Sequence, residues 1–230
     1  FKKQLHRIIK QNGAFAYPFN SIKRTVATIY SPDKQFRIFN WNIEMENGVN
    51  NFFCFILKKN GTVIELRDNH RNISNPELKS LTNKNWYGAL YYEIIPLGRG
   101  KYTMLGWNGR DAITTQKIIE VLSLGRKNAK FGANIFQYAD NKKKTKRRMI
   151  LEYANDAIVS LKYYQTKKEE RIVFSHLSPS TPQLEGQPQY YYPDLSYDSF
   201  VKEGRKWHFK TNRNVKNPKS HQDKNYNKPE

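Results

Sequence analysis

The sequence predicts a mostly β protein, in which an antiparallel meander curls into a barrel, a sandwich or an incomplete propeller and carries two or three short helices. Apolar and aromatic residues alternate in short runs, the period of a half-buried strand, and turn residues interrupt the runs at regular spacing. Hydrophobic residues make up 38% of the chain and aromatic residues 14%, too many for a disordered polypeptide. We therefore expect a packed β core.

The clearest strand signal is a hairpin over 52–58 and 62–67. Its turn, Asn60-Gly61, accepts the positive φ angles of a type I′ turn. Turn residues delimit the other predicted strands in the same way, at 25–30, 35–44, 86–95, 101–107, 148–153, 157–164, 171–176, 199–203 and 206–211.

Three segments have helical signals. The segment 3–11 places its aliphatic residues on one side and stops at a glycine, and 114–122 opens with threonines that can cap a helix. The segment 75–81 is shorter, with Asn75 as a candidate cap and Pro76 at the first helical position. We expect these three to be the helices of the fold.

The chain divides into three parts by composition. An N-terminal helical or extended segment covers 1–24, an antiparallel β domain covers 25–212, and a polar tail at 213–230 has almost no apolar side chains and should be extended. Alternation within the predicted strands selects the expected core residues: Phe36, Trp41, Phe53, Phe55, Ile64, Leu90, Leu105, Ile150, Leu161, Val173 and Trp207.

Catalytic and metal-binding patterns are not found in the sequence. Its serines form no Gly-x-Ser-x-Gly elbow, its glycines have no phosphate-binding spacing, and no two histidines stand three or four residues apart. The single cysteine, Cys54, excludes an internal disulfide and a four-cysteine zinc site. We expect a protein that is not an enzyme and that needs no metal, cofactor or small-molecule substrate.

The chain is strongly basic, with 40 Lys and Arg against 20 Asp and Glu and a net charge of +20. One basic run could hold the phosphate groups of a nucleic acid. The alternative is that this run forms a solvated hairpin loop. In either case, the positive electrostatic field of the protein favours acidic partners. The run consists of Lys142, Lys143, Lys144, Lys146, Arg147 and Arg148.

Tyrosines cluster after a long proline-rich connection at 177–188. Connections of that length are usually functional, and tyrosine combines a large apolar face with a polar tip, which suits a protein interface. The rings could equally close one end of the β structure. The candidate interface residues are Tyr190, Tyr191, Tyr192 and Tyr197.

The longest apolar run, 52–57, is far shorter than the roughly 18 residues of a membrane-spanning helix, so no such helix is expected. The chain starts at Phe1 rather than Met. Removal of an export signal would explain this start and place the protein beyond a membrane, whereas trimming for expression would imply nothing.

Several segments resemble a family of Bacteroidota cell-envelope proteins. They are 86–92, 94–96, 102–109, 117–122, 174–179, 193–198 and 217–218, and the similarity runs from about residue 25 into the tail. The resemblance extends to the plug subunit that closes the periplasmic mouth of the type IX secretion translocon. It implies a periplasmic protein that binds an outer-membrane protein or translocon complex, and it supplies no catalytic residues.

Together these observations predict a non-catalytic envelope protein that binds a larger protein complex through the tyrosines and the basic run. The alternative is a basic β domain that binds nucleic acid through the basic run.

Overall fold

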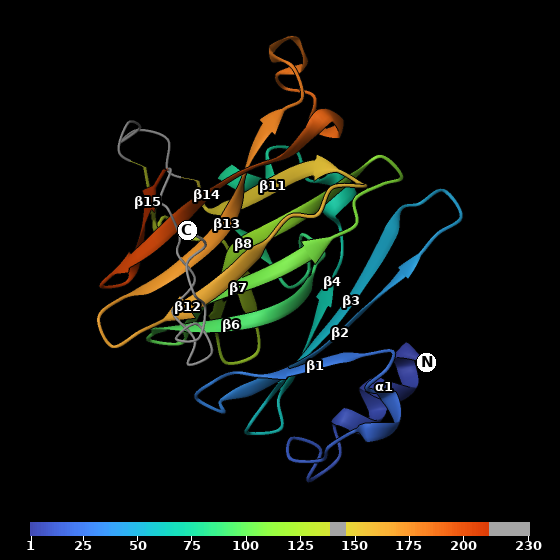
Figure 1. Ribbon diagram of the computed structural model, residues 1–230. Coiled ribbons are helices and arrows are strands. Elements are labelled where there is room, and N and C mark those ends of the chain that lie inside the picture. Colours follow the sequence, from blue (N-terminus) through green and yellow to red (C-terminus); the bar gives the residue numbers. More distant parts are fainter. Residues whose placement is uncertain (139–145, 212–230) are drawn as a thin grey trace, which may run out of the picture.

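The protein is mostly β, as predicted, with 51% of residues in strands and 11% in helices. A computed structural model describes residues 1–138 and 146–211. The strands form three sheets that are stacked rather than closed into a barrel (Figure 1). All strand pairs are antiparallel except β10 with β15.

The first sheet has the order β1-β2-β3-β4, with β1 (Ala27–Tyr30), β2 (Phe36–Glu44), β3 (Asn50–Lys58) and β4 (Val63–Arg67). The second has the order β5-β9-β8-β7-β6, with β5 (Leu81–Thr82), β9 (Ala129–Phe131), β8 (Thr114–Leu124), β7 (Lys101–Asn108) and β6 (Leu90–Gly98), and β11 (Arg148–Ala154) also pairs with β8. The third has the order β10-β15-β14-β13-β12, with β10 (Phe136–Gln137), β15 (Lys206–Lys210), β14 (Tyr191–Glu203), β13 (Glu170–Pro179) and β12 (Leu161–Gln165).

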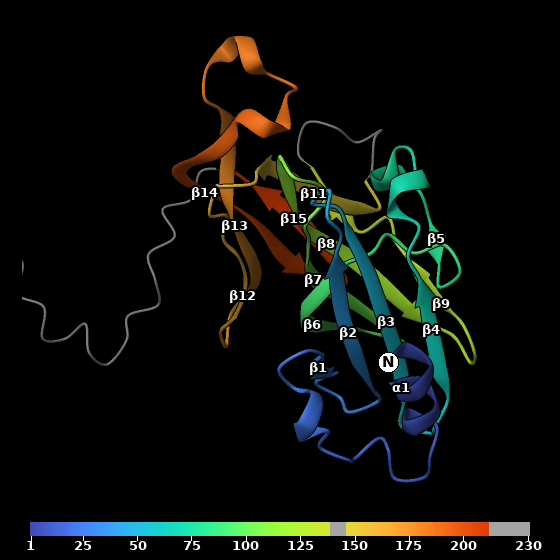
Figure 2. The same ribbon diagram turned by 90° about the vertical axis from the view of Figure 1, so that its right-hand side faces the viewer.

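The second sheet lies between the other two (Figure 2). One core cluster joins it to the first sheet through residues such as Ile56 and Met104, and another joins it to the third sheet through residues such as Ile119 and Phe174. A third cluster packs α1 (Lys2–Ile9) against the outer face of the first sheet. The N-terminal segment therefore covers a sheet face instead of extending from the domain.

The prediction of a helix over 114–122 is wrong, because this segment is the central part of strand β8. Ile118 faces the cluster shared with the first sheet and Ile119 the cluster shared with the third. A strand that is buried on both faces does not alternate between apolar and polar residues, so its pattern resembles that of a buried helix.

The other helix predictions have mixed outcomes. The segment 3–11 contains α1, which buries Leu5 and Ile9. The segment 75–81 holds only the 3-10 turn η3 (Pro76–Leu78), and Asn75 makes no capping side-chain bond there. The remaining 3-10 turns are η1 (Asn20–Ile22), η2 (His70–Asn72), η4 (Pro182–Leu184) and η5 (Pro188–Tyr190).

Most of the expected core residues are buried. Phe53, Leu90 and Ile150 are only partly buried, but each packs against a core cluster. The predicted polar tail at 213–230 lies outside the described residues.

A buried ion pair joins the second sheet to the η3 turn. Arg148 and Glu120 stand directly opposite each other in the β11–β8 ladder, and Arg148 Nε lies 2.8 Å from Glu120 Oε2 with both side chains fully buried. The hydroxyl of Tyr91 donates to the other oxygen of Glu120. The Arg148 guanidinium also donates to the carbonyl oxygens of Pro76 and of Lys79, the latter at 3.0 Å.

A second buried arginine attaches the N-terminal segment to the first sheet. Arg37 Nη1 donates to the carbonyl oxygens of Phe15 and Tyr17 at 3.0 and 2.6 Å and to the Tyr30 hydroxyl at 2.8 Å. Its guanidinium also lies 4.6 Å from the centre of the Phe39 ring. These bonds fix residues that contain no regular secondary structure of their own.

We predict that Arg148→Met lowers the free energy of unfolding by about 3–5 kcal/mol, because it leaves the Glu120 carboxylate buried without its cation. Urea denaturation followed by tryptophan fluorescence measures the change. The double variant Glu120→Leu, Arg148→Met should recover most of the loss, since no buried charge remains. Arg110→Ala, which removes an exposed ion pair with Glu152, serves as control and should cost at most about 1 kcal/mol.

Candidate functional site: a tyrosine-lined groove

A groove of about 870 Å³ lies where the edge of the second sheet meets the third sheet. Its walls come from β6, β8, β12 and the irregular part of β14. Four tyrosines and two exposed aliphatic side chains contribute to its apolar surface: Tyr92, Tyr163, Tyr164, Tyr197, Ile158 and Leu195. We call this site the tyrosine groove.

Leu195 and Ile158 are each 92% exposed, although both are large aliphatic residues. They belong to different segments, β14 and the connection before β12, yet both line the tyrosine groove. Exposed apolar residues are ordinary when they are isolated, but a cluster of them marks a binding surface. The groove thus has a composition that is typical of protein interfaces.

Local hydrogen bonds hold Leu195 in its exposed position. Its φ angle is +69°, in the left-handed region that a branched side chain seldom adopts. On either side, Asp194 Oδ1 accepts bonds from the Ser196 backbone N–H at 3.0 Å and from the Ser196 hydroxyl at 2.7 Å. These bonds stabilise the charged carboxylate and lower the pKa of Asp194.

An irregularity in the β13–β14 ladder creates this loop. The register shifts between Ser175 and Leu177, and His176 stands at the shift. Its Nδ1 lies 2.7 Å from Oδ2 of Asp198, whose side chain is 8% exposed. The His176–Asp198 contact thereby anchors the bulge beside the groove, as bulges commonly re-aim side chains at functional sites.

Two ionisable residues of the groove lie in a desolvated environment. Burial lowers the pKa of Lys117 and raises the pKa of Glu93. The Lys117 ammonium lies 5.3 Å from the centre of the Tyr92 ring, and no ion pair joins it to a carboxylate among the described residues. Lys117 is therefore a cation that a ligand carboxylate could pair with.

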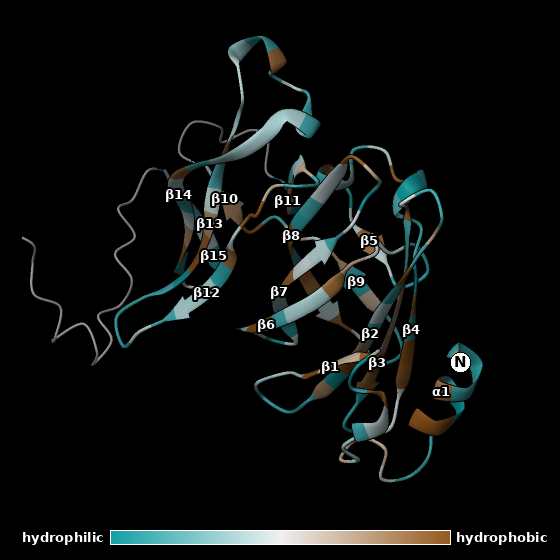
Figure 3. Cartoon of the chain, turned by 45° about the vertical axis from the view of Figure 1, so that its right-hand side comes forward, coloured by the Kyte–Doolittle hydropathy of each residue, from teal (hydrophilic) through white to brown (hydrophobic). Residues whose placement is uncertain are grey.

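The structure divides the predicted tyrosines among different environments. Tyr197 lines the groove, whereas Tyr190 lines a separate shallow hollow with Ile113. The Tyr191 hydroxyl accepts a bond from the Gly186 N–H at 3.0 Å, and the Tyr192 hydroxyl donates to Asp156 at 3.1 Å. Tyr191 thus bonds to the loop between β13 and β14, most of which is hydrophilic (Figure 3), and Tyr192 bonds to the connection between β11 and β12.

The basic run is not one continuous charged surface. Lys146 pairs with Glu77 at 2.7 Å, and Arg148 is fully buried beside Glu120, so the expectation that Arg148 contributes surface charge is wrong. Arg147 is partly exposed, and one of its guanidinium nitrogens donates to Ser80. Lys142, Lys143 and Lys144 lie outside the described residues.

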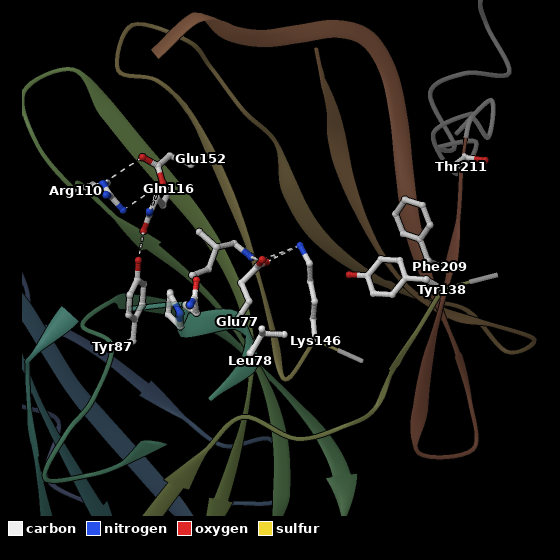
Figure 4. Close-up of a pocket in the computed structure, with 13 residues that line it drawn as sticks. Glu77, Leu78, Tyr87, Arg110, Gln116, Tyr138, Lys146, Glu152, Phe209 and Thr211 are labelled. Atoms are coloured by element: carbon white, nitrogen blue, oxygen red, sulfur yellow. Dashed lines mark hydrogen bonds and ion pairs between the residues drawn. The ribbon is translucent and has the colours of Figure 1, made fainter. Parts of the chain in front are cut away.

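A second cavity of about 760 Å³ lies between the η3 turn and strands β8, β11 and β15 (Figure 4). A chain of hydrogen bonds lines one wall: the Tyr87 hydroxyl donates to Gln116 at 3.0 Å, and Gln116 donates to Glu152 at 2.7 Å. Arg110 pairs with Glu152, and Lys146 with Glu77, so the charges of this cavity are internally neutralised.

The described residues contain no group of three potential metal ligands. Across the same parts of the chain, no helix is long and apolar enough to cross a membrane. No family model, curated protein or solved structure matches the chain.

Sequence reasoning missed Leu195, Ile158 and Lys117. A lone Leu between Asp194 and Ser196 does signal a turn with an exposed side chain, because Asp side chains bond the backbone two residues on. Nothing in the sequence places Ile158 or Lys117 beside that turn.

We predict that Leu195→Asn leaves the free energy of unfolding unchanged or raises it by up to about 1 kcal/mol, because Asn adopts positive φ more readily than Leu. Urea denaturation tests this. A loss of more than about 1 kcal/mol would show that Leu195 packs within the isolated protein.

Proposed function

We propose that this protein is a non-catalytic component of the cell envelope that binds a larger protein complex through the tyrosine groove. The observation that carries the proposal is the convergence of Leu195 and Ile158, both almost fully exposed, on a groove lined by four tyrosines. Such apolar and aromatic side chains are typical anchors of protein interfaces.

The placement in the envelope rests on the resemblance alone. Under that resemblance the protein is periplasmic and the complex is the outer-membrane translocon of type IX secretion, whose periplasmic mouth it would plug. Loss of the protein would then leave the pore permeable.

The pairing of two described cations of the basic run favours a protein partner over nucleic acid. Lys146 is paired with Glu77 and Arg148 with Glu120, so these two cations have protein carboxylates as partners. The tyrosine groove, by contrast, holds exposed apolar residues that would gain from burial in a protein interface.

We predict that the double variant Leu195→Ser, Tyr197→Ala loses the partner complex when a tagged form is purified from its native cell. Truncation of central aromatic and aliphatic anchors commonly costs about 2 kcal/mol or more, equivalent to at least about a 30-fold loss of affinity. The matched control is Ile43→Ser, Tyr17→Ala, which changes one exposed aliphatic residue and one exposed tyrosine outside the groove. Equal recovery of the complex with both variants would contradict the proposal.

The nucleic-acid alternative is tested by titrating labelled single-stranded DNA at about physiological salt. We expect weak binding that disappears as salt is raised, the behaviour of a generally basic protein. Micromolar affinity that is lost when Lys142, Lys143 and Lys144 are changed to Gln would favour the alternative.

A further inference from the structure

Strand β12 forms one edge of the third sheet, because it pairs with β13 on one side and with no described strand on the other. The same strand supplies Leu161, Lys162, Tyr163 and Tyr164 to the wall of the tyrosine groove. The groove therefore borders an open sheet edge as well as a set of apolar side chains.

The hydrogen bonds at both ends of β12 show which of its backbone groups face the groove. The carbonyl oxygen of Ser160 accepts a bond from the Ser175 N–H at 3.0 Å, and the Thr166 N–H donates to the backbone carbonyl oxygen of Glu169 at 2.8 Å. Backbone groups alternate in direction along an antiparallel strand, so even-numbered residues bond to β13. The N–H and C=O groups of Leu161, Tyr163 and Gln165 consequently point away from β13.

One side-chain bond confirms this direction. The hydroxyl of Tyr92, on β6, donates to the carbonyl oxygen of Leu161 at 3.2 Å. Among the described residues, no hydrogen bond is made to the backbone N–H or C=O groups of Tyr163 or Gln165 on this free edge. The free edge thus presents two residues whose N–H and C=O groups can pair with an added strand.

Two lysines and one carboxylate, Glu93, line the groove along this edge, and the net positive charge favours an acidic strand. Lys162 stands on β12, and Lys117 lies in the groove with its ammonium 5.3 Å from the centre of the Tyr92 ring. Neither is paired with a carboxylate among the described residues. Edge lysines discourage addition of a similar basic strand, and a second copy of this chain also carries a charge of +20. A carboxylate on the added segment would instead pair with the Lys117 ammonium and offset the cost of its desolvation.

We infer that the partner docks as an extended acidic segment that adds a strand to the free edge of β12 and places a carboxylate on Lys117. The backbone of the segment pairs with Tyr163 and Gln165, and its apolar side chains contact the groove residues beside this edge, Ile158 and Tyr92. This inference rests on the proposed function and adds the binding mode and the chemistry of the partner.

The probe is a fluorescein-labelled peptide, acetyl-Thr-Glu-Val-Thr-Glu-Val-Thr-amide, and binding to the full chain is measured by fluorescence anisotropy. We expect saturable binding with a dissociation constant below about 1 mM. A copy with N-methylated alternate residues, and a copy with Lys in place of Glu, should each bind at least about tenfold more weakly. Equal binding by the N-methylated copy, or no binding by the first peptide, would overturn the inference.

A matched pair of protein variants tests the edge itself. Tyr163→Pro removes the N–H that would bond to the added strand, whereas Tyr163→Thr removes the same ring but keeps that N–H. Proline is tolerated on an edge strand at a position facing away from its neighbour. We expect the proline variant to bind the peptide at least about tenfold more weakly than the threonine variant, and equal affinities would overturn the inference.

Hydrogen exchange provides a measurement that does not depend on a variant folding. The amides of Tyr163 and Gln165 should become protected in the presence of the peptide, and unchanged exchange at both would overturn the inference.

Lys117→Gln should weaken binding of the Glu peptide but not of the Lys peptide. If these tests fail while the Leu195 and Tyr197 double variant still loses the complex, the binding mode is wrong and the proposed function stands.

Discussion

The buried ion pair between Arg148 and Glu120 constrains how the sheets are assembled. The two residues face each other across β11 and β8, and the same guanidinium reaches the carbonyl oxygens of the η3 turn, which follows the first sheet in sequence. A two-residue slip of β11 would place Arg148 opposite Ile118 or Leu122 and leave both charges unpaired inside the core. Since unpaired buried charges are far more costly than paired ones, the pair specifies the register even if it adds little net stability.

The middle position of the second sheet explains the composition of the chain. Its strand β8 is covered on one face by the first sheet and on the other by the third, so a run of consecutive apolar residues is required there. The first sheet is likewise covered twice, by the second sheet and by α1, and β2 is buried along most of its length. The third sheet has an uncovered edge at β12, and the tyrosine groove forms there.

The groove combines features that add nothing to the stability of the isolated protein. Leu195 is held at a positive φ angle with its side chain in solvent. Within the part of the chain that the structure describes, Lys117 is desolvated without a carboxylate partner, and one edge of β12 is unpaired. Each of these is unfavourable or neutral in the free chain, and each would become favourable on contact with an extended acidic partner. Their coincidence at one place is the physical reason for proposing this surface as the binding site.

The sequence by itself determined the β class, the hairpin of β3 and β4 and helix α1, because alternation, turn chemistry and a one-sided aliphatic pattern are local signals. The predicted type I′ turn is wrong, because only Gly61, and not Asn60, has a positive φ angle and the Lys58 N–H bonds to the Thr62 carbonyl around a three-residue loop. It also identified Tyr197 as an interface candidate. Only the tertiary structure decided that 114–122 is a strand, that Arg148 is buried, and that Ile158, Lys117 and Leu195 share a groove. Burial on two faces removes the alternation that reveals a strand, and side chains from separate strands meet only through sheet stacking, which no local pattern encodes.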